Sequence, residues 1–206
     1  MKKIISIIQS RLMPKSHRCA VMQQWKRQGA PIPPPHEVKQ SIIIEYQQQF
    51  GYEILIETGT FLGKMIKAQQ NNFKRIYSIE LSEKLFQRAQ KKFRKYEHIT
   101  IYQGDSGKVL PEILKRIDKP AIFWLDGHYS AGITAKGEKE CPIYEELESI
   151  FNSHQKQFNH VLLIDDARCF IGEGDYPTIE ELTTFVLSKN ENYKLEVKDD
   201  VIRYII

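Results

Sequence analysis

A glycine-containing turn and a single acidic residue stand at the ends of two consecutive apolar runs. The segment 57–63, Glu-Thr-Gly-Thr-Phe-Leu-Gly, follows the apolar run 52–56, and the next apolar run ends at Glu80. Gly59 lacks the Cβ that would hold a ligand away from the backbone, and Gly63 allows the following helix to pack closely. The carboxylate of Glu80 can accept hydrogen bonds from both hydroxyls of a ribose. The arrangement predicts a nucleoside-binding turn.

The glycine spacing of this turn separates it from two common phosphate-binding loops. Gly59 and Gly63 do not form the dinucleotide pattern G-x-G-x-x-G, and the chain has no G-K-[ST] loop at this place. A cofactor without a phosphate to bind, such as S-adenosylmethionine, fits the turn better. Its ammonium group could be held by Glu57, the acidic residue that opens the segment.

Acidic residues also follow the later strand-like runs. Asp126 ends one run, and Asp165 and Asp166 end the next. Because the carboxyl ends of parallel strands meet at one edge of a sheet, these three side chains are expected to converge. Carboxylate oxygens at short range select hard cations such as Mg²⁺ or Ca²⁺. We therefore predict a divalent metal site at Asp126, Asp165 and Asp166, against the alternative that one aspartate of the last pair only caps a turn.

His128 lies two residues beyond Asp126 and is the predicted general base, with Asp126 as its catalytic neighbour. An imidazole in a loop at the mouth of a cleft can take up a proton near neutral pH, and it could also bind a metal or hydrogen-bond to the aspartate. The loop 130–137 is rich in small residues and is expected to fold over a substrate. Among the other histidines, His36, held by prolines ahead of a helix, is the one that could face the cleft.

Apolar runs and amphipathic segments alternate from residue 52 onward, the pattern of a parallel sheet with helices on both faces. Strands are expected at 52–56, 75–80, 99–103, 121–126 and 161–165, followed by an antiparallel hairpin of 193–197 and 201–206. Helices are expected at 62–71, 82–95, 111–117, 142–153 and from 178 towards 188, with Pro111 and Pro142 in first turns. The predicted fold class is α/β: a Rossmann-like, doubly wound, mostly parallel seven-stranded sheet with a C-terminal antiparallel hairpin.

The first fifty residues differ from the rest in charge and in their prolines. Up to residue 40 there are eight Lys or Arg residues against Glu37 alone, within a formal net charge of +4 for the chain. The proline-rich segment 30–36 cannot be helical, and a helix is expected at 37–50, ended by Gly51. We predict an N-terminal basic helical arm with a connector over 1–50 and one catalytic domain over 51–206. The basic residues are expected to form a solvated helix face rather than a nucleic-acid or membrane contact.

The length and composition of the chain argue against several classes of protein. A chain of 206 residues suits one domain with a full core. The apolar runs are too short to cross a bilayer or to form a signal peptide, so a cytoplasmic location without a membrane span is expected. The 3 cysteines are widely spaced and contain no C-x-x-C pair, which supports neither a disulfide framework nor a zinc site. The oligomeric state is left open, and a homo-oligomer is one option.

Taken together, the motifs resemble class I S-adenosylmethionine-dependent methyltransferases over residues 52–206. The segments 123–130, Phe-Trp-Leu-Asp-Gly-His-Tyr-Ser, and 163–168, Leu-Ile-Asp-Asp-Ala-Arg, look like those of a bacterial methyltransferase family of undefined substrate. They are more distantly similar to macrocin-type and catechol-type metal-dependent O-methyltransferases. In those families the counterparts of Asp126, Asp165 and Asp166 hold Mg²⁺. One departure is that macrocin-type enzymes carry an acidic residue where this chain has His128.

The same resemblance implies where the cofactor lies. Glu57, Thr58, Gly59 and Gly63 would line its amino acid end, Glu80 its ribose, and Asp105 with Ser106 its adenine. The full set of residues expected at the cofactor is Glu57, Thr58, Gly59, Thr60, Gly63, Glu80, Leu81, Asp105, Ser106 and Asp126.

These expectations combine into one reaction, the transfer of a methyl group from S-adenosylmethionine to a hydroxyl of a small molecule such as a sugar or a diol. Mg²⁺ on the three aspartates would lower the pKa of that hydroxyl while His128 takes its proton. One alternative is a metal-independent methyltransferase that acts on RNA or protein, again with His128 as base. Another is a non-catalytic module that binds the nucleoside. The arm has no interleaved basic and aromatic stripe beyond Trp25, which argues against nucleic acid as the partner and for a small-molecule acceptor.

Overall fold

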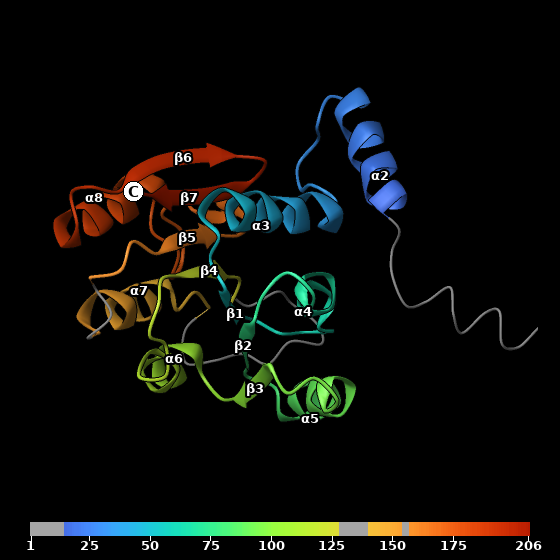
Figure 1. Ribbon diagram of the computed structural model, residues 1–206. Helices are drawn as coiled ribbons and strands as arrows, with labels where there is room; N and C mark the ends of the chain where they lie inside the picture. The colour runs from blue at the N-terminus through green and yellow to red at the C-terminus, as the bar shows by residue number, and fades with distance from the viewer. Residues whose placement is uncertain (1–14, 128–139, 154–156) are drawn as a thin grey trace, which may run out of the picture.

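Seven strands form one sheet at the centre of the computed structural model, which describes residues 15–127, 140–153 and 157–206 (Figure 1). The strands run in the order β3-β2-β1-β4-β5-β7-β6. β1 to β5 are parallel, and β7 runs antiparallel between β5 and β6. The predicted fold class is therefore confirmed. The strands are β1 (Ile54–Thr58), β2 (Arg75–Glu80), β3 (Ile99–Gln103), β4 (Ala121–Leu125), β5 (Val161–Ile164), β6 (Lys194–Lys198) and β7 (Val201–Ile205).

Helices cover both faces of this sheet. Figure 1 shows α6, α7 and α8 on one side of the strands and α3, α4 and α5 on the other. Successive residues of β1 point to opposite faces, so that Ile54 and Ile56 join one buried cluster and Leu55 joins the other. The helices are α2 (Lys15–Arg27), α3 (His36–Phe50), α4 (Lys64–Gln69), α5 (Glu83–Phe93), α6 (Ser106–Leu114), α7 (Ile143–Asn152) and α8 (Ile179–Lys189), with a 3-10 turn at Ala167–Cys169.

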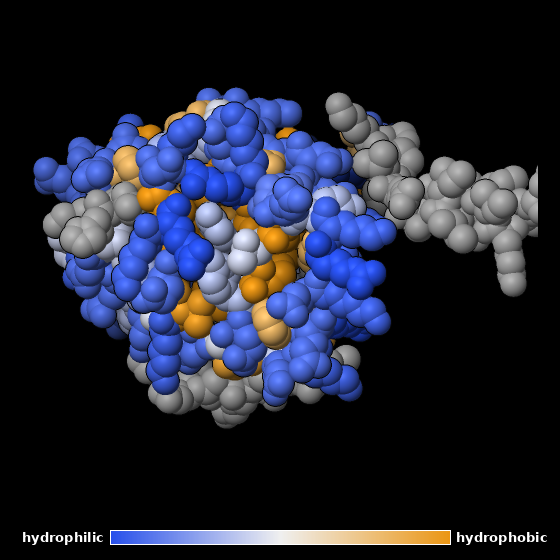
Figure 2. All heavy atoms as spheres, turned by 60° about the horizontal axis from the view of Figure 1, so that its bottom comes forward, coloured by the Kyte–Doolittle hydropathy of each residue, from blue (hydrophilic) through white to orange (hydrophobic). Residues whose placement is uncertain are grey.

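Several helix boundaries follow the sequence signals. Gly51 ends α3 in the left-handed region, with φ 66°. Thr178 and Glu181 form the reciprocal capping box that begins α8. None of the described helices combines the length and the apolarity that crossing a bilayer needs. The face in Figure 2 is mainly hydrophilic, with apolar side chains gathered in a hollow near its centre.

The prediction for α6 was wrong at its beginning. The helix starts at Ser106, and Pro111 lies inside it rather than in its first turn. Asp105 allows the early start, because its Oδ1 accepts a hydrogen bond from the backbone N–H of Gly107 at 2.9 Å. The carbonyl of Gly107, which a residue with an N–H at position 111 would bond, instead accepts from the hydroxyl of Ser149 in α7 at 3.5 Å.

The strand ends that carry the predicted site also shift slightly. β1 continues to Thr58, so Glu57 and Thr58 belong to the strand and not to the turn after it. β4 and β5 end one residue earlier than expected, at Leu125 and Ile164, which are paired with each other. Asp126 and Asp165 therefore follow their strands at the same level of the sheet.

The N-terminal segments pack against the sheet through α3. Ile42 and Ile43 are buried in the same cluster as Trp124 and Leu163 of the central strands. α2 is attached through Trp25, which is buried and donates its indole N–H to the carbonyl of Pro31 at 2.8 Å. The division of the chain at residue 50 stays a prediction, but α3 supplies part of the core on this face of the sheet.

Candidate functional site

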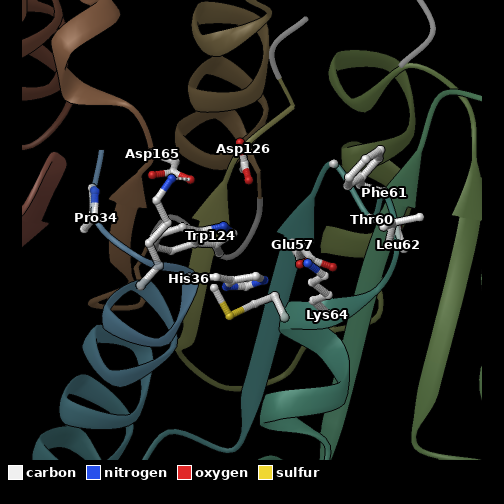
Figure 3. A pocket seen from close by; sticks show the side chains of 13 residues that line it. Pro34, His36, Glu57, Thr60, Phe61, Leu62, Lys64, Trp124, Asp126 and Asp165 are labelled. Carbon is white, nitrogen blue, oxygen red and sulfur yellow. Dashed lines mark hydrogen bonds and ion pairs between the residues drawn. The ribbon is translucent and has the colours of Figure 1, made fainter. Parts of the chain in front are cut away.

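A pocket of about 240 Å³ lies at the carboxyl ends of the central strands (Figure 3). This is the edge of the sheet at which ligands bind in doubly wound folds. Four groups of residues line it. They are the carboxyl ends of the strands (Glu57, Trp124, Asp126 and Asp165), the turn after β1 (Gly59, Thr60, Phe61 and Leu62), the segment that leads into α3 (Pro34, His36 and Lys39) and the start of α4 (Lys64 and Met65).

Glu57 is an almost completely buried acid in this pocket. Its Oε2 accepts a hydrogen bond from the hydroxyl of Ser78 on β2 at 2.5 Å. Burial raises the pKa of the Glu57 carboxyl to about 8, and the nearby Asp126 and Glu80 add to the rise. A cation placed against it would favour the ionised form, so the arrangement can hold an ammonium group.

Gly59 is required by the structure for a reason that the sequence analysis did not give. Its φ is 83°, and a Cβ on it would overlap the backbone carbonyl oxygen of Asp126. The glycine therefore lets the turn after β1 lie directly against the end of β4, and the expected approach of a ligand to its backbone stays a prediction. Gly63, with φ 61°, fits its predicted role, because a Cβ there would lie 2.6 Å from the ring of Phe93 in α5.

Glu80 holds the turn in place. Its two carboxylate oxygens accept from the backbone N–H groups of Phe61 and Ser82 at 2.7 and 2.9 Å. The first of these bonds fixes Phe61 in the left-handed region, with φ 47°. A carboxylate has further lone pairs, so these bonds are compatible with the predicted contact to ribose hydroxyls. The backbone of Leu81 accepts from the side-chain amide of Gln103 at 3.1 Å.

The threonines of the turn serve as internal braces. Thr58 is buried and its hydroxyl accepts from the backbone N–H of Asp126 at 3.1 Å. The hydroxyl of Thr60 lies 2.6 Å from that of Ser78. These bonds join β1, β2 and β4 around Glu57.

Asp105 and Ser106, the residues expected at the adenine, are outside the described lining of this pocket. Asp105 caps α6, and the hydroxyl of Ser106 donates to Oε1 of the buried Glu146 at 2.5 Å. Their contact with an adenine stays a prediction.

The three aspartates converge as the sequence predicts. Carboxylate oxygens of Asp126, Asp165 and Asp166 all lie within 4.8 Å of one another. Asp166 has a left-handed backbone, with φ 56°, and its N–H donates to Oδ1 of Asp165 at 2.8 Å. Three carboxylates at this range are the kind of oxygen ligand that Mg²⁺ prefers, provided that no other cation contacts them.

Lys39 is a site residue that the sequence analysis missed. Its Nζ lies 2.6 Å from Oδ2 of Asp165 and 3.0 Å from Oδ1 of Asp166. Burial opposes the charge of Lys39, but the two aspartates outweigh burial and raise its pKa. Burial raises the pKa of Asp165, with Lys39 acting in the opposite direction. The only sequence signal was a basic residue near the start of the helix predicted at 37–50.

A second cation contacts the same cluster. The Arg168 guanidinium donates to Oδ1 of Asp166 at 2.8 Å and also pairs with Asp200 in the turn between β6 and β7. The C-terminal hairpin is thereby connected to the site. Oδ1 of Asp166 accepts from both Lys39 and Arg168, so its negative charge is shared between two cations.

His36 faces the pocket, as the prolines before it suggested. Figure 3 shows His36 and Glu57 among the side chains that point into the cavity. The Nδ1 atom of His36 is shielded from solvent and has no hydrogen-bond partner among the described residues. Burial lowers the pKa of this imidazole, and Lys64 and Lys39 act in the same direction against a backbone hydrogen bond that raises it, so the neutral ring is favoured. The predicted base His128 and the loop 130–137 lie outside the described residues.

Solved structures with the same architecture are S-adenosylmethionine-related methyltransferases. The O-methyltransferase TomG from Streptomyces achromogenes, in complex with SAM, aligns with 97% of this chain and 93% of its own at a TM-score of 0.61 and 11% identity. For an O-methyltransferase from Bacillus cereus in complex with SAH, the alignment covers 99% of this chain and 97% of the other, with a TM-score of 0.59 and 14% identity. For SAH-bound PaMTH1 from Podospora anserina, it covers 99% of this chain and 94% of the other, with a TM-score of 0.56 and 13% identity.

At these identities the likeness shows the fold, and this chain has the α/β fold of those methyltransferases. No protein-family model matches the sequence, and no curated protein matches it. The assignment of activity therefore depends on the residues of the pocket.

Proposed function

We propose that the protein transfers a methyl group from S-adenosylmethionine to a hydroxyl oxygen of a small molecule such as a sugar or a diol. The observation that carries the proposal is that one pocket joins the buried Glu57 and the Gly59 turn to the strand-end acids Asp126 and Asp165. The first pair suits the amino acid end of the cofactor, and the second suits an acceptor beside it. The pocket lies at the edge of the sheet where ligands bind in this kind of fold.

The cofactor roles follow the chemistry of each side chain. Glu57 would hold the ammonium group, and Glu80 would bind the ribose while it keeps the turn closed. Asp105 and Ser106 would meet the adenine. The methyl carbon would then point from the sulfonium towards the aspartates, where an acceptor oxygen has to lie in line with the breaking bond.

A proton acceptor is needed because an alcohol oxygen is a poor nucleophile while protonated. His128 is the base proposed from the sequence. Among the described residues, His36 places in the same pocket an imidazole whose Nδ1 has no hydrogen-bond partner and whose lowered pKa favours the neutral form. A neutral imidazole can remove the acceptor's proton as the new C–O bond forms. Substitution of each histidine in turn distinguishes the two candidates.

The three aspartates suggest that Mg²⁺ could assist the reaction, but the position of Lys39 argues against a metal at this site. A bound Mg²⁺ would lower the pKa of the acceptor hydroxyl. However, Oδ2 of Asp165 and Oδ1 of Asp166 already accept hydrogen bonds from Lys39. With Lys39 in this position the three carboxylates do not fit a divalent ion, and the proposed reaction does not use one.

Calorimetry with S-adenosylmethionine and with its demethylated product tests the cofactor assignment directly. The wild type is expected to bind both with a stoichiometry of one, and Glu57→Gln to bind them at least tenfold more weakly. Glu83→Gln, a change in the first turn of α5 outside the pocket lining, is the matched control and should bind like the wild type. Equal binding by Glu57→Gln and the wild type would contradict the site.

A panel of small hydroxyl compounds, with labelled methyl donor, tests the reaction itself. Methylated product is expected for an acceptor small enough for the pocket. Normal cofactor binding with no product from any acceptor would favour a non-catalytic nucleoside-binding module. Transfer to RNA or protein, weakened steeply by added salt, would favour the macromolecular alternative.

A further inference from the structure

The aspartate cluster contains a cation that comes from the protein itself. Lys39 reaches it from the first turns of α3, and its side chain is 16% exposed, against 2% for Asp165 and 15% for Asp166. Ion pairs on open surfaces contribute little, but a shielded ammonium between two carboxylates neutralises charge that water does not screen. Removing one partner from such a group leaves an uncompensated charge in a site with little solvent.

We propose that Lys39 takes the place of a divalent metal in this site and that its ammonium group orients the acceptor oxygen. The catalytic half of this inference rests on the proposed methyl transfer. The binding half, exclusion of a divalent ion by Lys39, does not depend on any reaction.

Lys39 and a metal ion cannot occupy this site at the same time. Mg²⁺ binds carboxylate oxygens at about 2.0 to 2.1 Å and requires near-octahedral surroundings. An ion at that distance from Oδ2 of Asp165 and Oδ1 of Asp166 would occupy the space in which the Lys39 nitrogen now lies. The two cations would also repel each other at short range, so the metal could bind only after the lysine had left.

The position of Lys39 is fixed by its helix. One turn later, Ile42 and Ile43 are buried against the sheet, so the backbone of α3 cannot withdraw without opening the core. The cluster also includes Arg168, which shares Oδ1 of Asp166 with Lys39. Two cationic side chains, Lys39 and Arg168, therefore already contact Asp165 and Asp166.

The ammonium group retains a donor for a ligand. It has three N–H bonds, and two point to Asp165 and Asp166 in the described part of the chain. Lys39 also lines the pocket, so the third can reach an acceptor oxygen there. A hydrogen bond from a cation stabilises the negative charge that develops on that oxygen as its proton leaves. The acceptor class is one with an oxygen at the reacting position.

Titration with Mn²⁺, followed by the loss of its free-ion signal in electron paramagnetic resonance, tests the exclusion. The wild type should leave the Mn²⁺ signal at the level of buffer. Lys39→Met keeps the apolar stem but removes the charge, and it should gain one bound Mn²⁺ that the double variant Lys39→Met/Asp165→Asn loses. Lys64→Met, which removes another lysine of the pocket lining, is the matched control and should gain none.

Two results would overturn the inference. One is a Mn²⁺ site in the wild type that Asp165→Asn abolishes, and the other is a folded Lys39→Met that binds no Mn²⁺. Thermal unfolding establishes whether each variant is folded. If Lys39→Met does not fold, Lys39→Gln, which also removes the charge, replaces it in the same titration. Failure to bind S-adenosylhomocysteine in every variant would count against the proposed function alone, because the metal measurement does not use the cofactor.

Discussion

Glu57 and Ser78 face each other in register on β1 and β2, and the serine hydroxyl donates to the glutamate at 2.5 Å. Both side chains are buried. The pKa of Glu57 rises to about 8, from an ordinary value of 4.5, because an ionised carboxylate is poorly solvated at this position. Glu57 is therefore mainly protonated at pH 7 when no cation lies beside it.

The first prediction concerns stability. Between pH 4.5 and about 8 the folded protein binds more protons at Glu57 than the unfolded chain does, so this residue lowers stability as pH rises. Glu57→Gln removes the titration. The free energy of unfolding, measured with urea, should exceed that of the wild type by a few kcal/mol at pH 8 and by little at pH 5. A difference that does not change with pH would contradict the raised pKa.

A second prediction follows for cofactor binding. An ammonium group beside Glu57 favours the carboxylate, so binding between pH 6 and 7.5 should release about one proton. Calorimetry of S-adenosylhomocysteine in buffers with different ionisation enthalpies measures this number. Glu57→Gln should release none. If the wild type releases none either, the ammonium lies elsewhere in the pocket.

The third prediction separates the two candidate bases. If His36 is the base, His36→Ala should lower methyl transfer by about 10²- to 10⁴-fold and leave cofactor binding intact. Its pKa is lowered by burial, so the wild-type rate should stay level at neutral pH and fall only below about pH 6.5. His17→Ala, an exposed change on α2, is the control. If His128→Ala abolishes transfer and His36→Ala does not, His128 is the base.

The fourth prediction concerns the turn. Gly59→Ala combines a positive φ with overlap of the Asp126 carbonyl, and it should cost more than about 2 kcal/mol in the free energy of unfolding, with loss of cofactor binding. Gly51→Ala has a similar φ of 66° but open space around it, and it should cost about 1 kcal/mol. Chemical denaturation compares the two. Equal losses in the free energy of unfolding would show that backbone strain alone, and not the overlap with Asp126, opposes a side chain at position 59.

Much of the fold could be predicted from local sequence patterns, because neighbouring residues determine where most of the strands and helices form. Alternating apolar runs and amphipathic segments predicted the strands, and the glycine at 51 and the capping box at Thr178 placed helix ends that depend on neighbouring residues alone. The start of α6 was misplaced, since Pro111 was taken as a first-turn residue. A side chain from another helix, Ser149, compensates for its missing N–H, and this contact has no local signal.

For the site, the sequence by itself determined which acids stand at strand ends, because a parallel sheet brings those ends to one edge. That sufficed to predict the convergence of Asp126, Asp165 and Asp166. Only the tertiary structure decided what lies among them. Lys39 and Asp165 are 126 positions apart in the sequence. They come into contact because α3 packs against the face of the sheet that carries Trp124 and Leu163. Periodicity predicts that such a helix exists, but the packing of its buried side chains determines where its lysine points.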